Sequence, residues 1–351
     1  MLQTFRHEHR AANMKRRLSI SLFILLGIVL CGLALLALRP TEPSYQGRPI
    51  SAWLDDMTTK GPTDYYKAIE NIGTNALPYA VRNLGRNDSK WRKKYRELWP
   101  KFPKFLKQFL PQPKQNLQVV HGANVFSSIG PDAISQAITL LKHDSSTVRQ
   151  AAAWGLGSLR RKSTAVNQAI PALIETLRDP DRSVRFFATL TLKEMGADAS
   201  NAVPALAKIV GDNGVGTDQH SRAAAAYALG KIGPTARNAL PALKKALQEP
   251  SSYLRGQVAV AIWRIDSDAE TTLPVLLQEM PRTIEDSKWD WIIAVGEMGP
   301  RAKEAIPQLT NELKQDKKVW IREHIINALI KIDPEAAAKI DAHPLPEMKF
   351  E

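Results

Sequence analysis

The chain of 351 residues contains a single cysteine, Cys31, so no disulfide can form within it. Stability must come from packing instead. Hydrophobic residues make up 44% of the sequence and charged residues 24%, which is an ordinary globular composition. A chain of this length has room for one large domain or two smaller ones.

Motifs that carry enzyme chemistry are missing as well. None of the seven histidines forms a metal-ligand pair at i,i+4 on a predicted helix, and none has a cysteine partner. The sequence has no Gly-x-Ser-x-Gly step and no phosphate-binding loop that ends in Lys-Ser/Thr. We therefore expect no enzyme activity, no catalytic residue, no metal and no cofactor, and no small-molecule substrate is evident.

The net charge of +13 is confined to two stretches. Residues 1–17 and 82–114 together carry all of it, so the remainder of the chain is neutral. A basic isoelectric point that arises from two local clusters does not favour a nucleic-acid partner for the rest of the chain.

Near the N-terminus, one run lacks charge altogether. Leu18 to Leu38 is a stretch of 21 uncharged residues, preceded by Lys15, Arg16 and Arg17 and followed by Arg39. As a helix it would span about 30 Å, the thickness of a bilayer core. We expect a single-pass anchor at 18–38, a basic cytoplasmic tail at 1–17, and the remaining chain outside the cytoplasm, in the periplasm of a bacterium. A cleaved signal peptide is the alternative.

Residues 39–60 predict an extended linker followed by a short helix that Ser51 caps. Residues 61–115 predict a first repeat with a basic, aromatic insertion, in which Pro100, Pro103 and Pro111 exclude one straight helix. The insertion either lies on a membrane surface or packs on the first repeat. The membrane-surface residues would be Trp91, Arg92, Lys93, Lys94, Tyr95, Trp99, Lys101 and Lys104.

A small–aliphatic–proline step repeats along the rest of the chain, as in Ala239–Leu240–Pro241. From Pro171 onward its prolines are 33, 37, 33 and 33 residues apart, which indicates stacked helical repeats. Seven first helices are expected, at Pro78, Ser135, Pro171, Pro204, Pro241, Pro274 and Pro307. Asp333–Pro334 would open a final capping helix.

A second column of basic residues follows the same period, with acids such as Asp144, Asp179 and Glu249 often five or six residues earlier. This pattern predicts either an arginine–carboxylate ladder within the turns of the repeats or solvated charges. The basic residues are Arg149, Arg185, Arg222, Arg255, Lys288 and Arg322.

These two columns resemble those of HEAT repeats of the HEAT-like class also found in bilin lyases. Tyr45 to Leu54 also resembles a segment of some bacterial membrane-anchored HEAT-repeat proteins. The resemblance implies an all-α, right-handed α-solenoid over residues 116–342, with a tail at 343–351. It also implies that the second helix of each repeat lies on the concave face.

On the second helices, one face carries large apolar residues at regular offsets from the aliphatic–basic pair. They form either a groove for a segment of another protein or the packing between neighbouring helices. The partner-binding candidates are Trp154, Phe186, Leu190, Tyr227, Val260, Trp263 and Trp289.

The sequence therefore predicts a non-enzymatic, membrane-tethered scaffold that binds other proteins through the concave face of a solenoid. A bilin lyase-like enzyme or accessory subunit is one alternative, and a nucleic-acid-binding solenoid is another.

Overall fold

A computed structural model of the chain describes residues 42–59, 64–85, 94–95, 97–110, 119–212, 218–280, 285–315 and 318–340. The chain divides into two compact units, Met1–Pro49 and Ile50–Glu351. In the first unit, β1 (Ser44–Tyr45) pairs antiparallel with β2 (Arg48–Pro49). Gln46 and Gly47, between the strands, have φ values of 51° and 72°, as a tight hairpin turn requires. The linker is therefore a hairpin here rather than the extended spacer that the sequence predicted.

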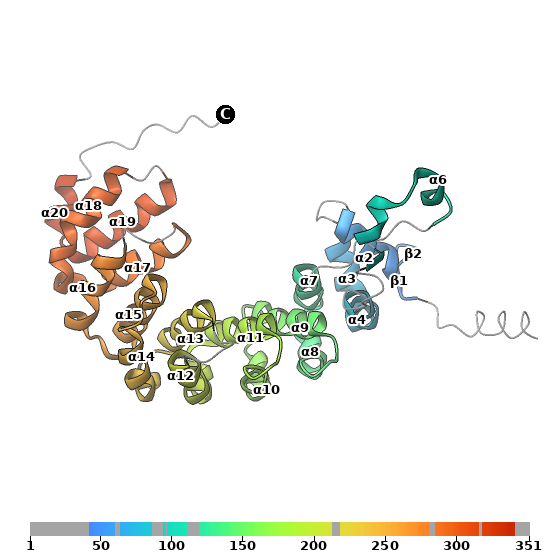
Figure 1. Cartoon of the computed structure of the whole chain (residues 1–351), viewed down its shortest axis with the longest axis horizontal. Coiled ribbons are helices and arrows are strands. Elements are labelled where there is room, and N and C mark those ends of the chain that lie inside the picture. Colours follow the sequence, from blue (N-terminus) through green and yellow to red (C-terminus); the bar gives the residue numbers. More distant parts are fainter. Residues whose placement is uncertain are drawn as a thin grey trace, which may run out of the picture. The chain divides into compact units, whose positions relative to one another are not determined.

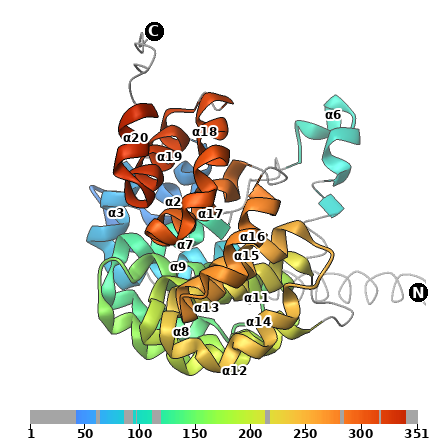
Figure 2. The ribbon, with the colours of Figure 1, turned by 90° about the vertical axis from the view of Figure 1, so that its left-hand side faces the viewer.

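The second unit is built from pairs of helices, coloured in chain order in Figures 1 and 2. The first helices of the pairs are α4 (Leu77–Gly85), α8 (Ile134–Leu140), α10 (Ile170–Thr176), α12 (Val203–Gly211), α14 (Leu240–Ala246), α16 (Ala269–Glu279) and α18 (Ile306–Gln315). The second helices are α7 (Val119–Ile129), α9 (Ser146–Leu159), α11 (Arg182–Met195), α13 (Gln219–Ile232), α15 (Ser252–Asp266), α17 (Glu285–Glu297) and α19 (Val319–Ile332). Each second helix packs on the next, and we call these helices the B-helix row.

Helices at the two ends of this unit complete the array. Before the first pair lie α2 (Ile50–Thr59) and α3 (Asp64–Ile72), which pack together, and α3 also packs on α7. After the last pair, α20 (Pro334–Ile340) packs on α19. Asp333 accepts hydrogen bonds from the backbone N–H groups of Glu335 and Ala336, so it caps α20. The expected final capping helix is thus confirmed.

The proline column marks the first helices because proline suits the first turn, where its missing N–H is not needed. Proline is the second residue of α10, α12 and α14, and each helix follows directly on a 3₁₀ segment: Thr164–Ala169, Gly196–Ala202 and Gly233–Ala239. Similar segments, Gly73–Ala76, Pro131–Ala133 and Gly299–Ala305, precede α4, α8 and α18. Gly196, Gly233 and Gly299 have positive φ and end the preceding second helix.

The pair of α16 and α17 departs from this pattern at its start. Pro274 lies inside α16, which begins at Ala269 rather than beside the proline. No 3₁₀ segment separates α15 from α16, since Ser267 takes the left-handed conformation with φ of 57° and Asp268 caps α16. The connection is short because the chain reaches a capping aspartate two residues after α15 ends.

Four of the second helices begin at residues whose side chains accept backbone N–H groups. Ser145, Asp181, Asp218 and Ser251 cap α9, α11, α13 and α15 in this way. Although burial opposes ionisation of Asp218, hydrogen bonds from Ser221 and His220 and the charge of Arg182 hold its pKa below the usual value.

At two crossings of neighbouring second helices, small residues face each other. A Cβ on Gly230 would lie 3.0 Å from the Cα of Ala261, and one on Gly296 would lie 2.8 Å from the Cα of Ala328. Second helices therefore approach each other closely where only glycine and alanine face each other. Larger core residues lie on both kinds of helix: Leu173 of α10 and Trp291 of α17 are both fully buried.

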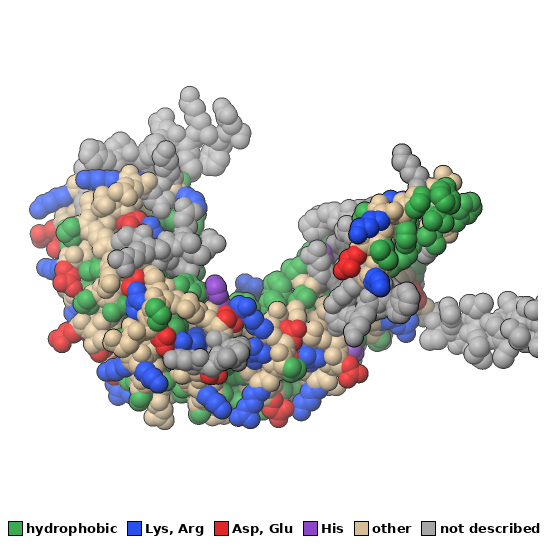
Figure 3. All heavy atoms as spheres, viewed as in Figure 1, with side chains coloured by type: hydrophobic (Ala, Val, Ile, Leu, Met, Phe, Trp, Pro, Cys, Tyr) green, Lys and Arg blue, Asp and Glu red, His purple; other side chains and the backbone are tan. Residues whose placement is uncertain are grey.

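The insertion falls between α4 and α7, the two helices of the first pair. Its described part is broken at the prolines, as expected: Trp99–Lys101 is a 3₁₀ turn and α6 (Lys104–Lys107) begins after Pro103. Tyr95, Trp99 and Phe102 pack on one another with ring centroids 5.7 to 6.1 Å apart. Figure 3 shows hydrophobic side chains gathered at α6, where Phe105 and Phe109 are 62% and 82% exposed.

Among the proposed membrane-surface residues, Lys94 and Lys101 are exposed. Trp91, Arg92 and Lys93 lie outside the described residues, as does the side chain of Lys104. The predicted location in a membrane must be corrected. In the part of the chain that the structure describes, no helix is long and apolar enough to cross a bilayer. The expected anchor, Leu18 to Leu38, lies outside those residues.

Candidate functional site

An aromatic stack joins two neighbouring helices of the B-helix row. Trp154 on α9 and Phe187 on α11 lie face to face, with ring centroids 4.9 Å apart and planes 11° apart. Phe186 meets the edge of Phe187 at 5.8 Å. All three side chains are only partly buried, so the stack keeps an open side. Aromatic side chains with one face available are the usual anchors of protein interfaces.

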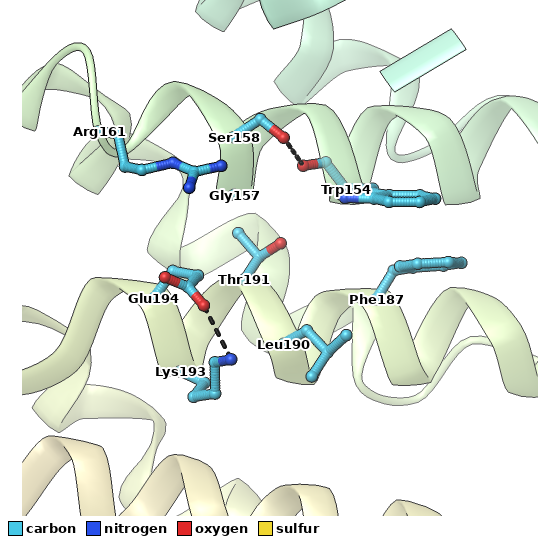
Figure 4. Close-up of a pocket in the computed structure, with 9 residues that line it drawn as sticks. All are labelled: Trp154, Gly157, Ser158, Arg161, Phe187, Leu190, Thr191, Lys193 and Glu194. Carbon is cyan, nitrogen blue, oxygen red and sulfur yellow. Dashed lines mark hydrogen bonds and ion pairs between the residues drawn. The ribbon is translucent and has the colours of Figure 1, made fainter. Parts of the chain in front are cut away.

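Beside the stack, a pocket of about 140 Å³ opens between α9 and α11 (Figure 4). Its apolar end is formed by Trp154, Phe187 and Leu190. Its polar end carries Ser158 from α9 and Arg161 from the turn that follows α9, opposite residues of α11. The full lining is Trp154, Gly157, Ser158, Arg161, Phe187, Leu190, Thr191, Lys193 and Glu194.

Tyr227 lies further along the row, among cations. The Nζ atoms of Lys193 and Lys231 are 5.2 and 5.5 Å from its ring centroid, and the guanidinium carbon of Arg264 is 5.9 Å away. Burial, reinforced by the charge of Asp290, raises the pKa of Tyr227 to about 12. Tyr227 is therefore a neutral phenol held by its neighbours, and only part of its surface is open.

Two of the predicted partner-binding residues are not at an open surface. Val260 is fully buried and Trp263 is 6% exposed, because Arg301 covers the Trp263 ring at 4.7 Å from its centroid. Both belong to the packing between helices, which corrects their assignment to a groove. The remaining candidate, Trp289 on α17, is partly exposed and lies 6.1 Å from His324 of α19.

A buried ion pair lies behind this face. The Nη2 of Arg264 on α15 donates to Oδ1 of Asp290 on α17 at 3.0 Å, and the Tyr227 hydroxyl donates to the same oxygen at 3.5 Å. Asp290 is 3% exposed. Burial opposes the charged form of Arg264, but the carboxylates of Asp290 and Glu297 outweigh burial and raise the pKa of Arg264. Asp290 thus links three successive second helices, since it binds Arg264 of α15 and Tyr227 of α13.

Four of the six residues in the basic column pair with a carboxylate, and each carboxylate comes from the following repeat. Arg149 binds Asp179 through two hydrogen bonds of 2.7 and 2.9 Å, while its Nη1 donates to the carbonyls of His143 and Asp144 in its own turn. The other pairs are Arg222 with Glu249, Arg255 with Glu279, and Lys288 with Glu312. The sequence predicted that each basic residue pairs with an acid of its own turn, and this prediction is wrong. The ladder instead links neighbouring repeats.

Sequence reasoning missed three parts of this face. Phe187 falls outside the chosen offsets, although the adjacent phenylalanines 186 and 187 were a visible signal. Arg264 and Asp290 stand 26 residues apart and give no local signal at all. Within the described ranges, no group of three His, Cys, Asp or Glu side chains is placed to hold a metal ion.

Pairs of antiparallel helices stacked in chain order define an α-solenoid. Within that class, a family model for HEAT repeats matches residues 134–217, and one for the PBS lyase HEAT-like repeat matches residues 221–249. The chain therefore contains HEAT repeats in these residues. No curated protein sequence matches it.

Several solved structures are similar to this chain. A chain in the structure of the complex of CpcE and CpcF of phycocyanin lyase from Nostoc sp. PCC7120 is 19% identical to this chain. The match covers 85% of this chain and 97% of that chain, at a TM-score of 0.49. A chain of the Kap95:Nup1 complex is 14% identical, with 91% and 46% covered, at 0.48. The designed armadillo repeat protein YIII(Dq)4CqI is 16% identical, with 57% and 100% covered, at 0.40.

Proposed function

We propose that this protein is a non-enzymatic scaffold that binds a segment of another protein along its B-helix row. The observation that carries the proposal is the partly open Trp154–Phe187 stack, extended by Phe186. Apolar side chains that gather on an exposed face mark interaction sites, and aromatic anchors dominate the energy of many interfaces.

The row continues beyond the stack, which suits an extended or helical partner segment. His220 and Tyr253 are 5.7 Å apart on α13 and α15, and Trp289 and His324 are 6.1 Å apart on α17 and α19. Trp320, also on α19, is 42% exposed. These aromatic groups are carried by successive second helices, so one bound segment can meet several of them.

Site-specific photo-crosslinking in cells tests the proposal. A photoreactive amino acid replaces Phe186 in one variant and Gln136, an exposed residue of the first helix α8, in the matched control. We expect a defined protein partner to be captured from position 186 and not from position 136. Capture should disappear when Trp154→Ser is added. Equal capture from both positions, or capture that survives Trp154→Ser, would contradict the proposal.

A further inference from the structure

The pocket beside the aromatic stack has chemistry of its own, which narrows the class of partner. Its space of about 140 Å³ is close to that of cavities that admit a benzene-sized group, about 150 Å³. Trp154, Phe187 and Leu190 line the end nearest the stack. That end suits one apolar or aromatic side chain.

A glycine keeps the floor of the pocket open. A Cβ added to Gly157 would lie 2.8 Å from the hydroxyl oxygen of Thr191. Thr191 is held in place, since its hydroxyl donates to the carbonyl of Ala153 at 2.6 Å. A larger residue at position 157 would therefore fill the space between α9 and α11 that the lining side chains leave free.

The other end of the pocket carries Arg161 and a lysine and a glutamate whose charges are paired. Lys193 and Glu194 pair with each other at 2.8 Å, so their charges cancel. Arg160 is bound to Asp198 at 2.8 Å. Arg161 is exposed and makes no ion pair with any residue that the structure describes, and Figure 4 shows its guanidinium at this end of the pocket.

We infer that the pocket binds an apolar or aromatic side chain of a partner polypeptide together with a carboxylate beside it. Arg161 binds the carboxylate in the forked geometry that a guanidinium provides. Trp154 and Phe187 contact the apolar side chain. This inference rests on the proposed function and adds the chemistry of the bound segment: an acidic residue next to an apolar one.

Selection from a phage library of random twelve-residue peptides tests the inference. The bait is the full chain in three forms: unchanged, Arg161→Glu, and Arg178→Glu. Arg178 is an exposed arginine that does not line this pocket, so it is the matched control. Peptides selected on the unchanged protein and on Arg178→Glu should carry Asp or Glu within a few positions of Phe, Leu or Trp. Arg161→Glu should instead select Lys or Arg at those positions.

Fluorescence anisotropy of the best acidic peptide measures how much affinity each variant loses. Loss of a charge-assisted hydrogen bond should weaken binding by about tenfold or more in Arg161→Glu, with no change in Arg178→Glu. Melting temperatures of both variants should match that of the unchanged protein, because both arginines are exposed.

Failure of this inference is distinguishable from failure of the proposed function. If the peptides that compete with crosslinking at position 186 lack Asp and Glu, or bind Arg161→Glu as tightly as the unchanged protein, the pocket chemistry alone is overturned. Selection of no peptide, with equal crosslinking at positions 186 and 136, would overturn both.

Discussion

Two tryptophans of the B-helix row, Trp154 and Trp263, differ in what surrounds them. Trp154 stacks on Phe187 with one side open, whereas Trp263 is 6% exposed beneath Arg301. The energy of an aromatic pair is about 1 kcal/mol, while truncating a buried tryptophan costs about 3 to 5 kcal/mol. The two residues therefore have different roles even though both lie on second helices.

We predict that Trp154→Ser lowers the free energy of unfolding by about 1 kcal/mol and that Trp263→Ser lowers it by about 3 kcal/mol or more. Urea denaturation followed by circular dichroism measures both. The crosslinking yield at position 186 should fall in Trp154→Ser even though that protein stays folded. A larger loss of stability in Trp154→Ser than in Trp263→Ser would contradict this division of roles.

A second residue of interest is the capping aspartate Asp218. Because its pKa is lowered in the folded state, its contribution to stability is present above the ordinary value of 3.8 and is lost as the pH falls through the folded-state pKa. We predict that Asp218→Ala costs about 1 kcal/mol near neutral pH, whereas Asp218→Asn, which keeps the cap, costs less. Denaturation from about pH 5 to about pH 3 should show that the advantage of the unchanged protein over Asp218→Asn shrinks in acid.

Packing between second helices depends on glycine at the closest points. At Gly296, a Cβ would lie 2.8 Å from backbone of α19, which cannot move away as a flexible side chain can. At Gly211, the last residue of α12, a Cβ would lie 3.9 Å from the Cβ of Ala242, which is ordinary contact. Two glycines in helices thus have opposite environments.

We predict that Gly296→Ala destabilises the protein by about 1 to 3 kcal/mol, while Gly211→Ala leaves it unchanged or stabilises it by up to about 1 kcal/mol. Thermal melting of the two variants beside the unchanged chain provides the measurement. If both substitutions raised the melting temperature, helix propensity rather than close packing would govern these positions.

The elements differed in how well the sequence predicted them. Starts of first helices followed from proline, because its preference for the first turn is local. The α16 helix escaped this rule because Asp268 offered an earlier cap. Val260 was misassigned, since an offset along one helix does not say where the neighbouring helix crosses it. Ladder partners and the Arg264–Asp290 pair depend on how repeats stack, which no short pattern encodes.

At the scale of the whole molecule, ion pairs of the ladder connect neighbouring repeats. The junction between the α14–α15 pair and the α16–α17 pair has two ion pairs: the ladder pair of Arg255 with the fully buried Glu279 of α16, and Arg264 with Asp290 of α17. This is also the junction whose connection lacks the usual 3₁₀ segment. Repeats contact only their neighbours, so the free energy of one junction determines whether the two sides of it unfold together.

We predict that Glu279→Gln uncouples the repeats on the two sides of this junction. The substitution keeps the size of the side chain but leaves Arg255 without its buried counter-ion, which costs about 3 to 5 kcal/mol. Hydrogen exchange at increasing urea should then show α17 and α19 opening before α9 and α11, whereas all four open together in the unchanged protein. The control is Lys142→Gln, which removes an inter-repeat pair whose side chains are 73% and 66% exposed, and it should leave exchange unchanged. Equal loss of protection in all four helices of Glu279→Gln would show that the junction does not control cooperativity. In that case the ladder would contribute to total stability without setting how the repeats are coupled.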